Sequence, residues 1–309
     1  MELVAPATIR YIKLGPGGAW ASKCLSNGEI HFGIAGEPHD LAAKGDWDSV
    51  VAHFVAQGRI RAKARDLARE IQDFHTLGAD CLWITFADRC LWWAFAEPHV
   101  TINGAAGPDT AVCARRTIDG WHKTNLKGEP LRADSLSSKL TQVAAYQQTI
   151  CSVKASDYLL RRINAVPEPI VAEAQTVRTA MVASASAMIA QLHWADFEIM
   201  VDLIFARGGW QRTSVLGGTM ADIDLLIEQP TLDERASVQV KSRAGQAVLD
   251  EHIALFAASG LGRTFFVCHS PDGALTTRGA FGVHLWTNTH LAEIAVRSGL
   301  FEWLMERVG

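Results

Sequence analysis

The chain has 309 residues, of which 49% are hydrophobic and 20% charged, so it can bury a core and is not disordered. Residues 1–150 hold 16 Lys and Arg against 16 Asp and Glu, and the remainder holds 13 against 17, for a net charge of −4. This balance excludes a protein that binds nucleic acid through overall positive charge. No apolar run approaches the roughly 20 residues of a membrane span, and the N-terminus does not read as a signal peptide.

Cysteine and histidine spacing predicts neither a disulfide framework nor a zinc site. The six cysteines have no CxxC pair or regular spacing: Cys24, Cys81, Cys90, Cys113, Cys151 and Cys268. Four histidines of the second half also lack metal-ligand spacing: His252, His269, His284 and His290. This usage favours free thiols in a reducing environment, and we expect a cytoplasmic protein with no membrane attachment.

The first half is predicted to be rich in strands, with one main helix. Alternating or apolar runs between turn residues predict strands at 8–14, 29–34, 81–86 and 91–96. Helices are expected at 49–57 and 62–75. Shorter ordered pieces are expected at 115–121 and 149–151.

A basic run lies at the start of the main helix. Residues 58–69 carry five cations and one anion. Phosphate contacts dominate nucleic-acid affinity, so we assign DNA contacts to four of these cations, namely Arg59, Arg61, Lys63 and Arg65. The alternative interpretation is an ordinary solvated helix start.

A proline-rich break separates the halves. A short helix at 156–164 is followed by Pro167 and Pro169, then by an alanine-rich helix at 170–192. We therefore predict domains at 1–165 and 170–309. The second is expected to continue with a helix from residue 193, a hairpin, and then helix 249–258, strands 264–269 and 283–286, and helix 289–308, an α/β order.

The hairpin of the second half carries side chains suited to chemistry. Residues 223–227 are apolar, and residues 237–242 alternate polar and apolar after a turn. Gln239 and Lys241 therefore share one face of the second strand, and pairing brings them beside Asp224. Metal-assisted phosphodiester hydrolysis needs a carboxylate for a divalent cation and a lysine near the attacking water.

This spacing resembles the PD-(D/E)xK nuclease core in its Mrr-like branch, where glutamine replaces the second acid and the motif reads QxK. The sequence HWADFE at residues 193–198 opens a helix that Gly208-Gly209-Trp210 ends, like the D/W-FE…GW helix of Mrr-like domains. The chain departs from the family at Asp222, where glycine is usual. Asp222 is either a turn residue, which we favour, or an additional acid.

The resemblance implies a role for each matching position. Glu198 would be the helix acid that leans into the site, and Asp224 the metal carboxylate. Gln239 and the Val240 carbonyl would be further Mg²⁺ ligands. Lys241 would be the catalytic lysine. An ordinary hairpin with an exposed glutamine and lysine is the alternative.

The first half resembles EVE and PUA-like domains that read modified bases. The sequences YIKLG at 11–15, GEIHFG at 28–33 and GADCLW at 78–83 follow the outline of that family. The resemblance implies a small β-barrel that holds an extruded base in an aromatic pocket. The rings proposed for this pocket by their turn or strand positions are Trp20, Trp47 and Trp93. Trp92 and Trp93 must face opposite sides of a sheet, so both can be in a core only if both faces are covered.

We therefore predict an α+β chain of two domains, an N-terminal PUA/EVE-like β-barrel with helices and a C-terminal α/β PD-(D/E)xK core. The predicted function is a modification-dependent, type IV-like DNA endonuclease that uses Mg²⁺. Its predicted partner is double-stranded DNA carrying a modified base, with a homodimer at least on DNA. The alternatives are a DNA-binding module with an inert nuclease fold and a nuclease gated by a nucleotide or protein ligand.

Overall fold

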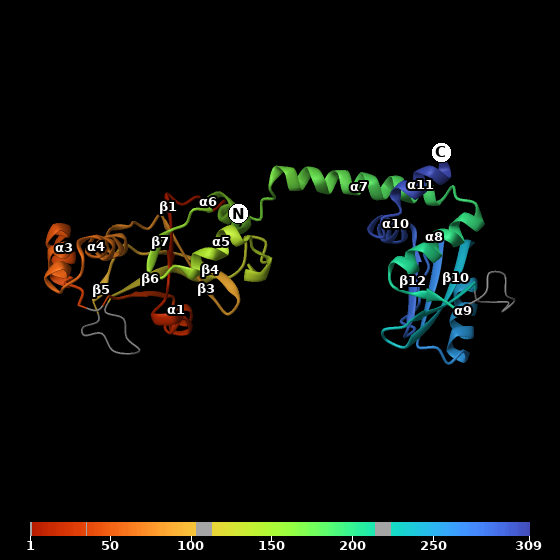
Figure 1. The fold of residues 1–309 in the computed structure, drawn as a ribbon, viewed down its shortest axis with the longest axis horizontal. Helices are drawn as coiled ribbons and strands as arrows, with labels where there is room; N and C mark the ends of the chain where they lie inside the picture. The colour runs from red at the N-terminus through yellow and green to blue at the C-terminus, as the bar shows by residue number, and fades with distance from the viewer. Residues whose placement is uncertain (1, 35, 103–112, 214–223) are drawn as a thin grey trace. The chain divides into compact units, whose positions relative to one another are not determined.

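A computed structural model describes residues 2–34, 36–102, 113–213 and 224–309. Residues 1–168 and 169–309 form two compact units, coloured red to light green and green to blue in Figure 1. Each unit contains its own β-sheet. Within the described residues, none of the helices has both the length and the hydropathy to cross a bilayer.

The first unit is built on a seven-stranded sheet. Its order is β2-β6-β4-β3-β1-β7, with β5 added to β6, and only β1 and β3 pair in parallel. The strands are β1 (Thr8–Ile12), β2 (Glu29–Phe32), β3 (Cys81–Ala87), β4 (Cys90–Ala96), β5 (Thr101–Ile102), β6 (Cys113–His122) and β7 (Ile150–Ser152).

This sheet is a curled half-barrel and not the closed barrel that was expected. The strand β6 pairs with β2 through Cys113–Arg116 and with β4 through residues 117–122, so it changes its partner strand along its length and curls the sheet. A barrel closes when its edge strands pair. Here the edges β2 and β7 are only four and three residues long, and they are not paired with each other in the described part of the chain.

Helices cover both faces of the curled sheet. The helices and 3-10 turns are η1 (Pro16–Gly18), α1 (Ala21–Asn27), α2 (His39–Lys44), α3 (Trp47–Ala56), α4 (Arg61–Thr76), η2 (Ala133–Ser135), α5 (Ser138–Thr141), η3 (Gln142–Ala145) and α6 (Ser156–Asn164). Phe54 and Phe74 of α3 and α4 pack in one core, and Leu140 and Leu159 of α5 and α6 in another. Both faces are thus covered, which lets Trp93 pack in one core while Trp92 packs against the other.

The short helices of this unit, α1, α2 and α5, were not predicted. The helix α1 spans only seven residues and ends at Gly28, and α2 spans six and ends at Gly45, with both glycines in the left-handed region. Segments of this length hold less than two full turns, so they show no 3.6-residue periodicity.

The second unit has a mixed five-stranded sheet of order β12-β11-β10-β9-β8. The first three strands are parallel, and β9 and β8 join antiparallel. The strands are β8 (Gln211–Arg212), β9 (Leu225–Gln229), β10 (Glu234–Ala244), β11 (Arg263–Pro271) and β12 (Val283–Thr287). The expected hairpin is therefore present as β9 and β10.

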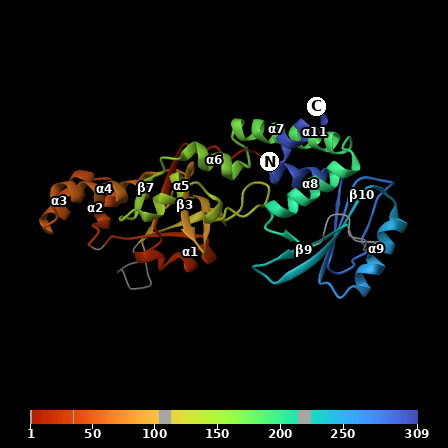
Figure 2. The same cartoon turned by 45° about the vertical axis from the view of Figure 1, so that its right-hand side comes forward.

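The helices of this unit lie on opposite faces of the sheet (Figure 2). They are α7 (Pro169–Ile189), α8 (Trp194–Arg207), α9 (Gln246–Ala258), α10 (Asn288–Arg297) and α11 (Phe301–Val308). Val238 and Val240 of β10 pack on the face covered by α7, α8, α10 and α11, whereas α9 covers the other face. The single C-terminal helix that was expected is two helices, because Gly299 takes a φ of 71° and ends the first.

Candidate active site

Asp224 directly precedes β9, next to the point where the pairing of β9 with β10 ends. Its backbone N–H donates to the Val238 carbonyl at 3.1 Å, next to the last residue pair of the β9–β10 ladder. Its Oδ2 accepts hydrogen bonds from Gln239 Nε2 and from the Val240 N–H, both at 2.6 Å. The Asp224 carboxylate thus accepts the hydrogen bond from Val240 N–H that the backbone of a paired strand would otherwise accept.

The strand β10 presents oxygen donors beside this carboxylate. Val240 donates its N–H to Asp224, and the N–H and C=O of one strand residue point to the same edge, so the Val240 carbonyl also faces Asp224. Gln239 is buried at 5% exposure, and half a turn of its amide would present Oε1. Asp224, Gln239 and Val240 therefore offer three oxygen ligands, the donor type that Mg²⁺ prefers.

Two further charged side chains share this environment. Burial raises the pKa of Glu198 on α8, and the Asp224 carboxylate raises it further, whereas Arg212 and Lys241 lower it. Lys241 is half-buried on β10, two residues beyond Gln239 and on the same face. Asp224, Arg212 and Lys241 therefore all act electrostatically on Glu198.

Arg212 and His252 were not among the predicted site residues. Arg212 is half-buried on β8. His252 of α9 is buried, and its Nε2 lies 2.9 Å from Thr264 Oγ1. Burial lowers the pKa of His252, and the charges of Asp224 and Lys241 also act on it. Neither residue is part of a sequence motif. Their proximity to Asp224 follows only from the pairing of β8 with β9 and from the packing of α9 on the sheet.

Asp222 and the first residue of the predicted strand, Ile223, lie outside the described residues.

A restriction endonuclease family model, Mrr_cat, matches residues 189–295. This range contains α8 and all five strands of the mixed sheet, and with them every residue of the Asp224 site. The C-terminal part of the chain contains an Mrr restriction endonuclease domain.

Similarity to known proteins was also sought among solved structures and among curated sequences. A structure described as "DNA modification-dependent restriction endonuclease AspBHI" matches with a TM-score of 0.33 and 10% identity, over 73% of this chain and 68% of that chain. No curated protein sequence matches the chain.

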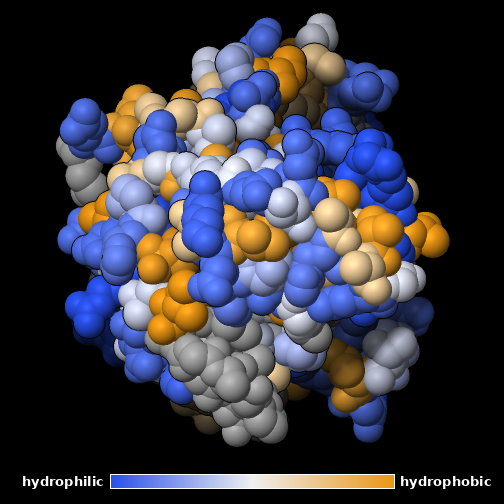
Figure 3. All heavy atoms as spheres, turned by 90° about the vertical axis from the view of Figure 1, so that its left-hand side faces the viewer, coloured by the Kyte–Doolittle hydropathy of each residue, from blue (hydrophilic) through white to orange (hydrophobic). Residues whose placement is uncertain are grey.

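Outside the Mrr domain, three of the residues predicted to bind DNA line one hollow of the first unit. Trp47 of α3 and Arg61 and Arg65 of α4 border a cavity of about 720 Å³, together with Val51 and Val55. The face that carries α3 is hydrophilic, with apolar side chains gathered between the polar ones (Figure 3). A ring, an apolar wall and two cations therefore meet at this place.

The other predicted cations lie elsewhere. Lys63 is half-buried and is close enough for its charge to act on the buried Glu70, and it is not among the residues that line the hollow. Arg59 is exposed in the turn before α4, where its N–H donates to the Phe54 carbonyl.

The other predicted rings differ in burial. Trp20 is half-buried over Gly15, where an added Cβ would lie 2.5 Å from the indole, and it meets His31 edge-on. Trp93 is 7% exposed and donates its indole N–H to the Thr124 carbonyl at 2.9 Å. The surroundings of Trp93 are those of a packed core ring.

Proposed function

We propose that this chain is a modification-dependent DNA endonuclease that cuts with Mg²⁺ at the Asp224 edge and reads a modified base with its first unit. The observation that carries the proposal is the Asp224 carboxylate, bonded to both Gln239 and Val240 within the charge environment of Lys241 and Glu198. The Mrr domain makes DNA hydrolysis the expected chemistry.

Asp224, the Gln239 amide oxygen and the Val240 carbonyl would hold the ion. When bound, Mg²⁺ supplies Lewis-acid stabilisation of the phosphate and lowers the pKa of a coordinated water. The protein places the three ligand residues side by side, on β10 and directly before β9, and a turn of the Gln239 amide would complete the oxygen set.

Lys241 and Glu198 would complete the chemistry. The Lys241 ammonium can orient the attacking water and balance the negative charge that develops on the phosphate oxygens. Burial, followed by the Asp224 carboxylate, raises the pKa of Glu198, which favours proton binding by this carboxyl relative to an exposed glutamate.

The hollow beside Trp47 supports the reading function. Extruding a base from a duplex costs a few kcal/mol, and stacking on an aromatic ring returns about 1–3 kcal/mol. Trp47 offers such a ring, and Arg61 and Arg65 lie where the phosphates flanking a flipped base need cations. A methyl group on the base would gain about 0.8 kcal/mol against Val51 and Val55.

Double-strand cleavage by this enzyme requires two copies of the site. One Asp224–Gln239–Lys241 site can hydrolyse one strand at a time, so we propose a homodimer on DNA, related by a two-fold axis. The expected substrate is double-stranded DNA that carries a modified base.

The test is cleavage of matched duplexes that are plain, methylated or hydroxymethylated, with Mg²⁺ or with EDTA. We expect Mg²⁺-dependent cutting of at least one modified duplex and little cutting of the plain one. Asp224→Asn, which keeps the shape and removes the charge, should bind the same duplex without cutting.

Two other outcomes identify the alternatives. Selective binding with no cutting under any condition would indicate a DNA-binding module with an inert nuclease fold, in which the Gln239–Asp224 bond replaces the ion. Equal cutting of plain and modified duplexes would instead indicate a nuclease whose first unit senses another ligand.

A further inference from the structure

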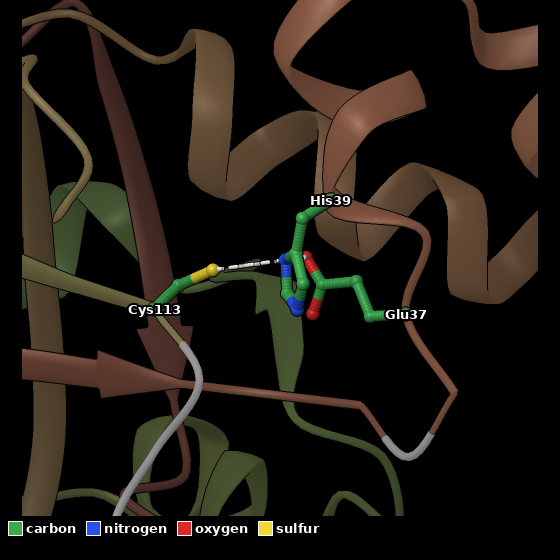
Figure 4. A group of neighbouring side chains, drawn as sticks. All are labelled: Glu37, His39 and Cys113. Atoms are coloured by element: carbon green, nitrogen blue, oxygen red, sulfur yellow. Dashed lines mark hydrogen bonds and ion pairs between the residues drawn. The ribbon is translucent and has the colours of Figure 1, made fainter. Parts of the chain in front are cut away.

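Four side chains that are distant in sequence meet at one end of the curled sheet. Glu37 lies in the loop before α2, His39 is the first residue of α2, His75 lies in the last turn of α4, and Cys113 begins β6. Figure 4 shows Glu37, His39 and Cys113 turned toward one another. One donor atom from each of these three lies within 4.8 Å of the others.

The donor atoms of both histidines lie close to Cys113 and to Glu37. Cys113 Sγ lies 3.5 Å from His39 Nδ1, 4.0 Å from His75 Nε2 and 3.9 Å from Glu37 Oε1. Glu37 Oε1 lies 3.6 Å from His39 Nδ1 and 3.6 Å from His75 Nε2. Ligands at about 2.0–2.3 Å from a tetrahedral zinc lie about 3.3–3.6 Å apart. Glu37, His39 and Cys113 already lie near these distances, whereas His75 does not belong to this close group, so the two imidazoles would have to turn toward each other on binding.

The surroundings of Glu37 indicate an ion more than an ordinary ion pair. The Glu37 side chain has 0% exposure, and its Oε2 accepts a hydrogen bond from the Ile34 N–H at 3.3 Å. Its other oxygen, Oε1, faces the two imidazoles and the thiol. A buried carboxylate is costly unless a cation or several donors compensate it, and an outer hydrogen bond that orients a ligating carboxylate is typical of metal sites.

We propose that Glu37, His39, His75 and Cys113 bind one Zn²⁺ ion. A thiolate and two imidazoles are donors that select zinc over magnesium, and a carboxylate oxygen is a common fourth zinc ligand. Four protein ligands close the coordination sphere, which is the mark of a structural site and not of a catalytic one.

The ion would tie three separate segments together. The metal would link the loop before α2, the end of α4 and the start of β6 through side chains. This inference is independent of the proposed nuclease activity, because its ligands belong to the first unit and none belongs to the Asp224 site.

The first test measures metal bound to the full chain purified without added metal. Elemental analysis should find about one zinc per chain, and Asp224→Ala should retain it. Cys113→Ser and His75→Ala should lose it, whereas Cys24→Ser, which changes another buried free thiol, should keep it. Wild-type protein without stoichiometric zinc, or zinc that Cys113→Ser retains, would overturn the proposal.

Cobalt substitution keeps the test decisive if a ligand variant fails to fold. The wild-type chain loaded with Co²⁺ should show the intense visible bands of a tetrahedral ion and a thiolate charge-transfer band. His39 is the most exposed ligand, with 22% of its side chain accessible. His39→Cys should keep the ion and strengthen the thiolate band, while His39→Ala should weaken binding. Absence of both spectral features from folded wild-type protein rules out the site.

Discussion

The two units carry polar clusters that differ in donor type and in burial. At the Asp224 edge of the Mrr domain the proposed metal ligands are all oxygen atoms, and Asp224 and Lys241 are half exposed. The cluster around Glu37 in the first unit mixes oxygen, nitrogen and sulfur and is almost closed to solvent. Burial, followed by the Glu37 carboxylate, raises the pKa of the Cys113 thiol to about 12.

This difference separates chemistry from structure within one chain. Oxygen donors at an accessible strand end suit an ion that meets substrate and exchanges, whereas a closed site of mixed donors suits an ion that stays bound. Changes at the Asp224 edge should therefore affect cleavage and spare folding and binding. Changes in the first unit should affect stability or recognition and spare the chemistry of bound DNA.

The largest effect is expected at the Asp224 edge. Asp224→Ala and Lys241→Ala should each lower cleavage at least about 10³-fold, because one pre-organised electrostatic group alone supplies about 10²–10³. Binding of the modified duplex, measured with Ca²⁺ in place of Mg²⁺, should hold. Glu228→Ala, on the same strand β9, is the matched control and should cut normally.

Glu198→Ala should have a smaller effect on cleavage, with Asp202→Ala one turn later on α8 as its control. Wild-type cutting by Asp224→Ala or Lys241→Ala would show that the site lies elsewhere.

Among the three rings proposed for the base pocket, Trp93 should cost the most stability when it is replaced by alanine. The substitution removes a ring with 7% exposure and leaves the Thr124 carbonyl without its donor, so we expect a loss of about 3–5 kcal/mol of stability. The melting temperature of the full chain measures this loss. If Trp93→Ala melted like the wild type and lost selectivity for modified DNA, Trp93 would belong to the reading site.

Trp47→Ala should show the opposite behaviour. Because Trp47 is half-buried at the rim of the hollow, its loss should cost about 1–3 kcal/mol of selectivity for the modified duplex with little change in melting. Trp20→Ala, measured in parallel, tests the other half-buried ring. Should both variants keep full selectivity, the base is read at another place.

Arg61→Gln and Arg65→Gln should each weaken binding to every duplex alike and reduce the salt dependence by about one counterion. Lys63→Gln is the internal control, since Lys63 lies close to Glu70 and does not line the hollow. Arg59→Gln tests the exposed arginine before α4. Affinity lost for modified DNA alone would place the arginines on the base itself and not on phosphates.

The smallest effect concerns pH. Burial raises the pKa of Glu70, whose Oε2 accepts from the Thr149 and Ile150 N–H groups. A raised carboxyl pKa favours the folded state below the unfolded pKa of about 4.3, and this contribution is lost as pH rises through the folded pKa. Glu70→Gln, which carries no charge, should therefore become more stable relative to the wild type as the pH rises from acidic to neutral. Melting temperatures that shift in parallel over this range would contradict the assignment.

Local patterns predicted much of the fold. Helix α6 has the predicted limits of 156–164, and α3, α4, α7, α8 and the β9–β10 hairpin lie within a few residues of their predicted positions. These elements are long or strongly periodic, so their own residues determine them. The strand order of the curled sheet could not be predicted, because β6 pairs with β2 and β4, strands that are not its neighbours in sequence.

The Asp224 site and the cluster around Glu37 also differ in how far the sequence predicts them. Asp224, Gln239 and Lys241 lie within one hairpin, so their spacing in sequence already predicts that they meet. Glu37 and His39 are separated from His75 and Cys113 by whole helices and strands, and their spacing predicts nothing. Only the pairing of β6 with β2 and the packing of α4 bring these donors together.

Every strand pair in the described residues joins strands of the same unit, and the units meet in sequence at the segment 165–169. Cutting the chain in this segment would therefore break none of these strand pairs. If the two units have the proposed functions, recombination at this point would give the Mrr domain a different reading unit, in evolution or by design. A hybrid that joins residues 166–309 to another reader would then keep the Asp224 site and change the DNA that it cuts.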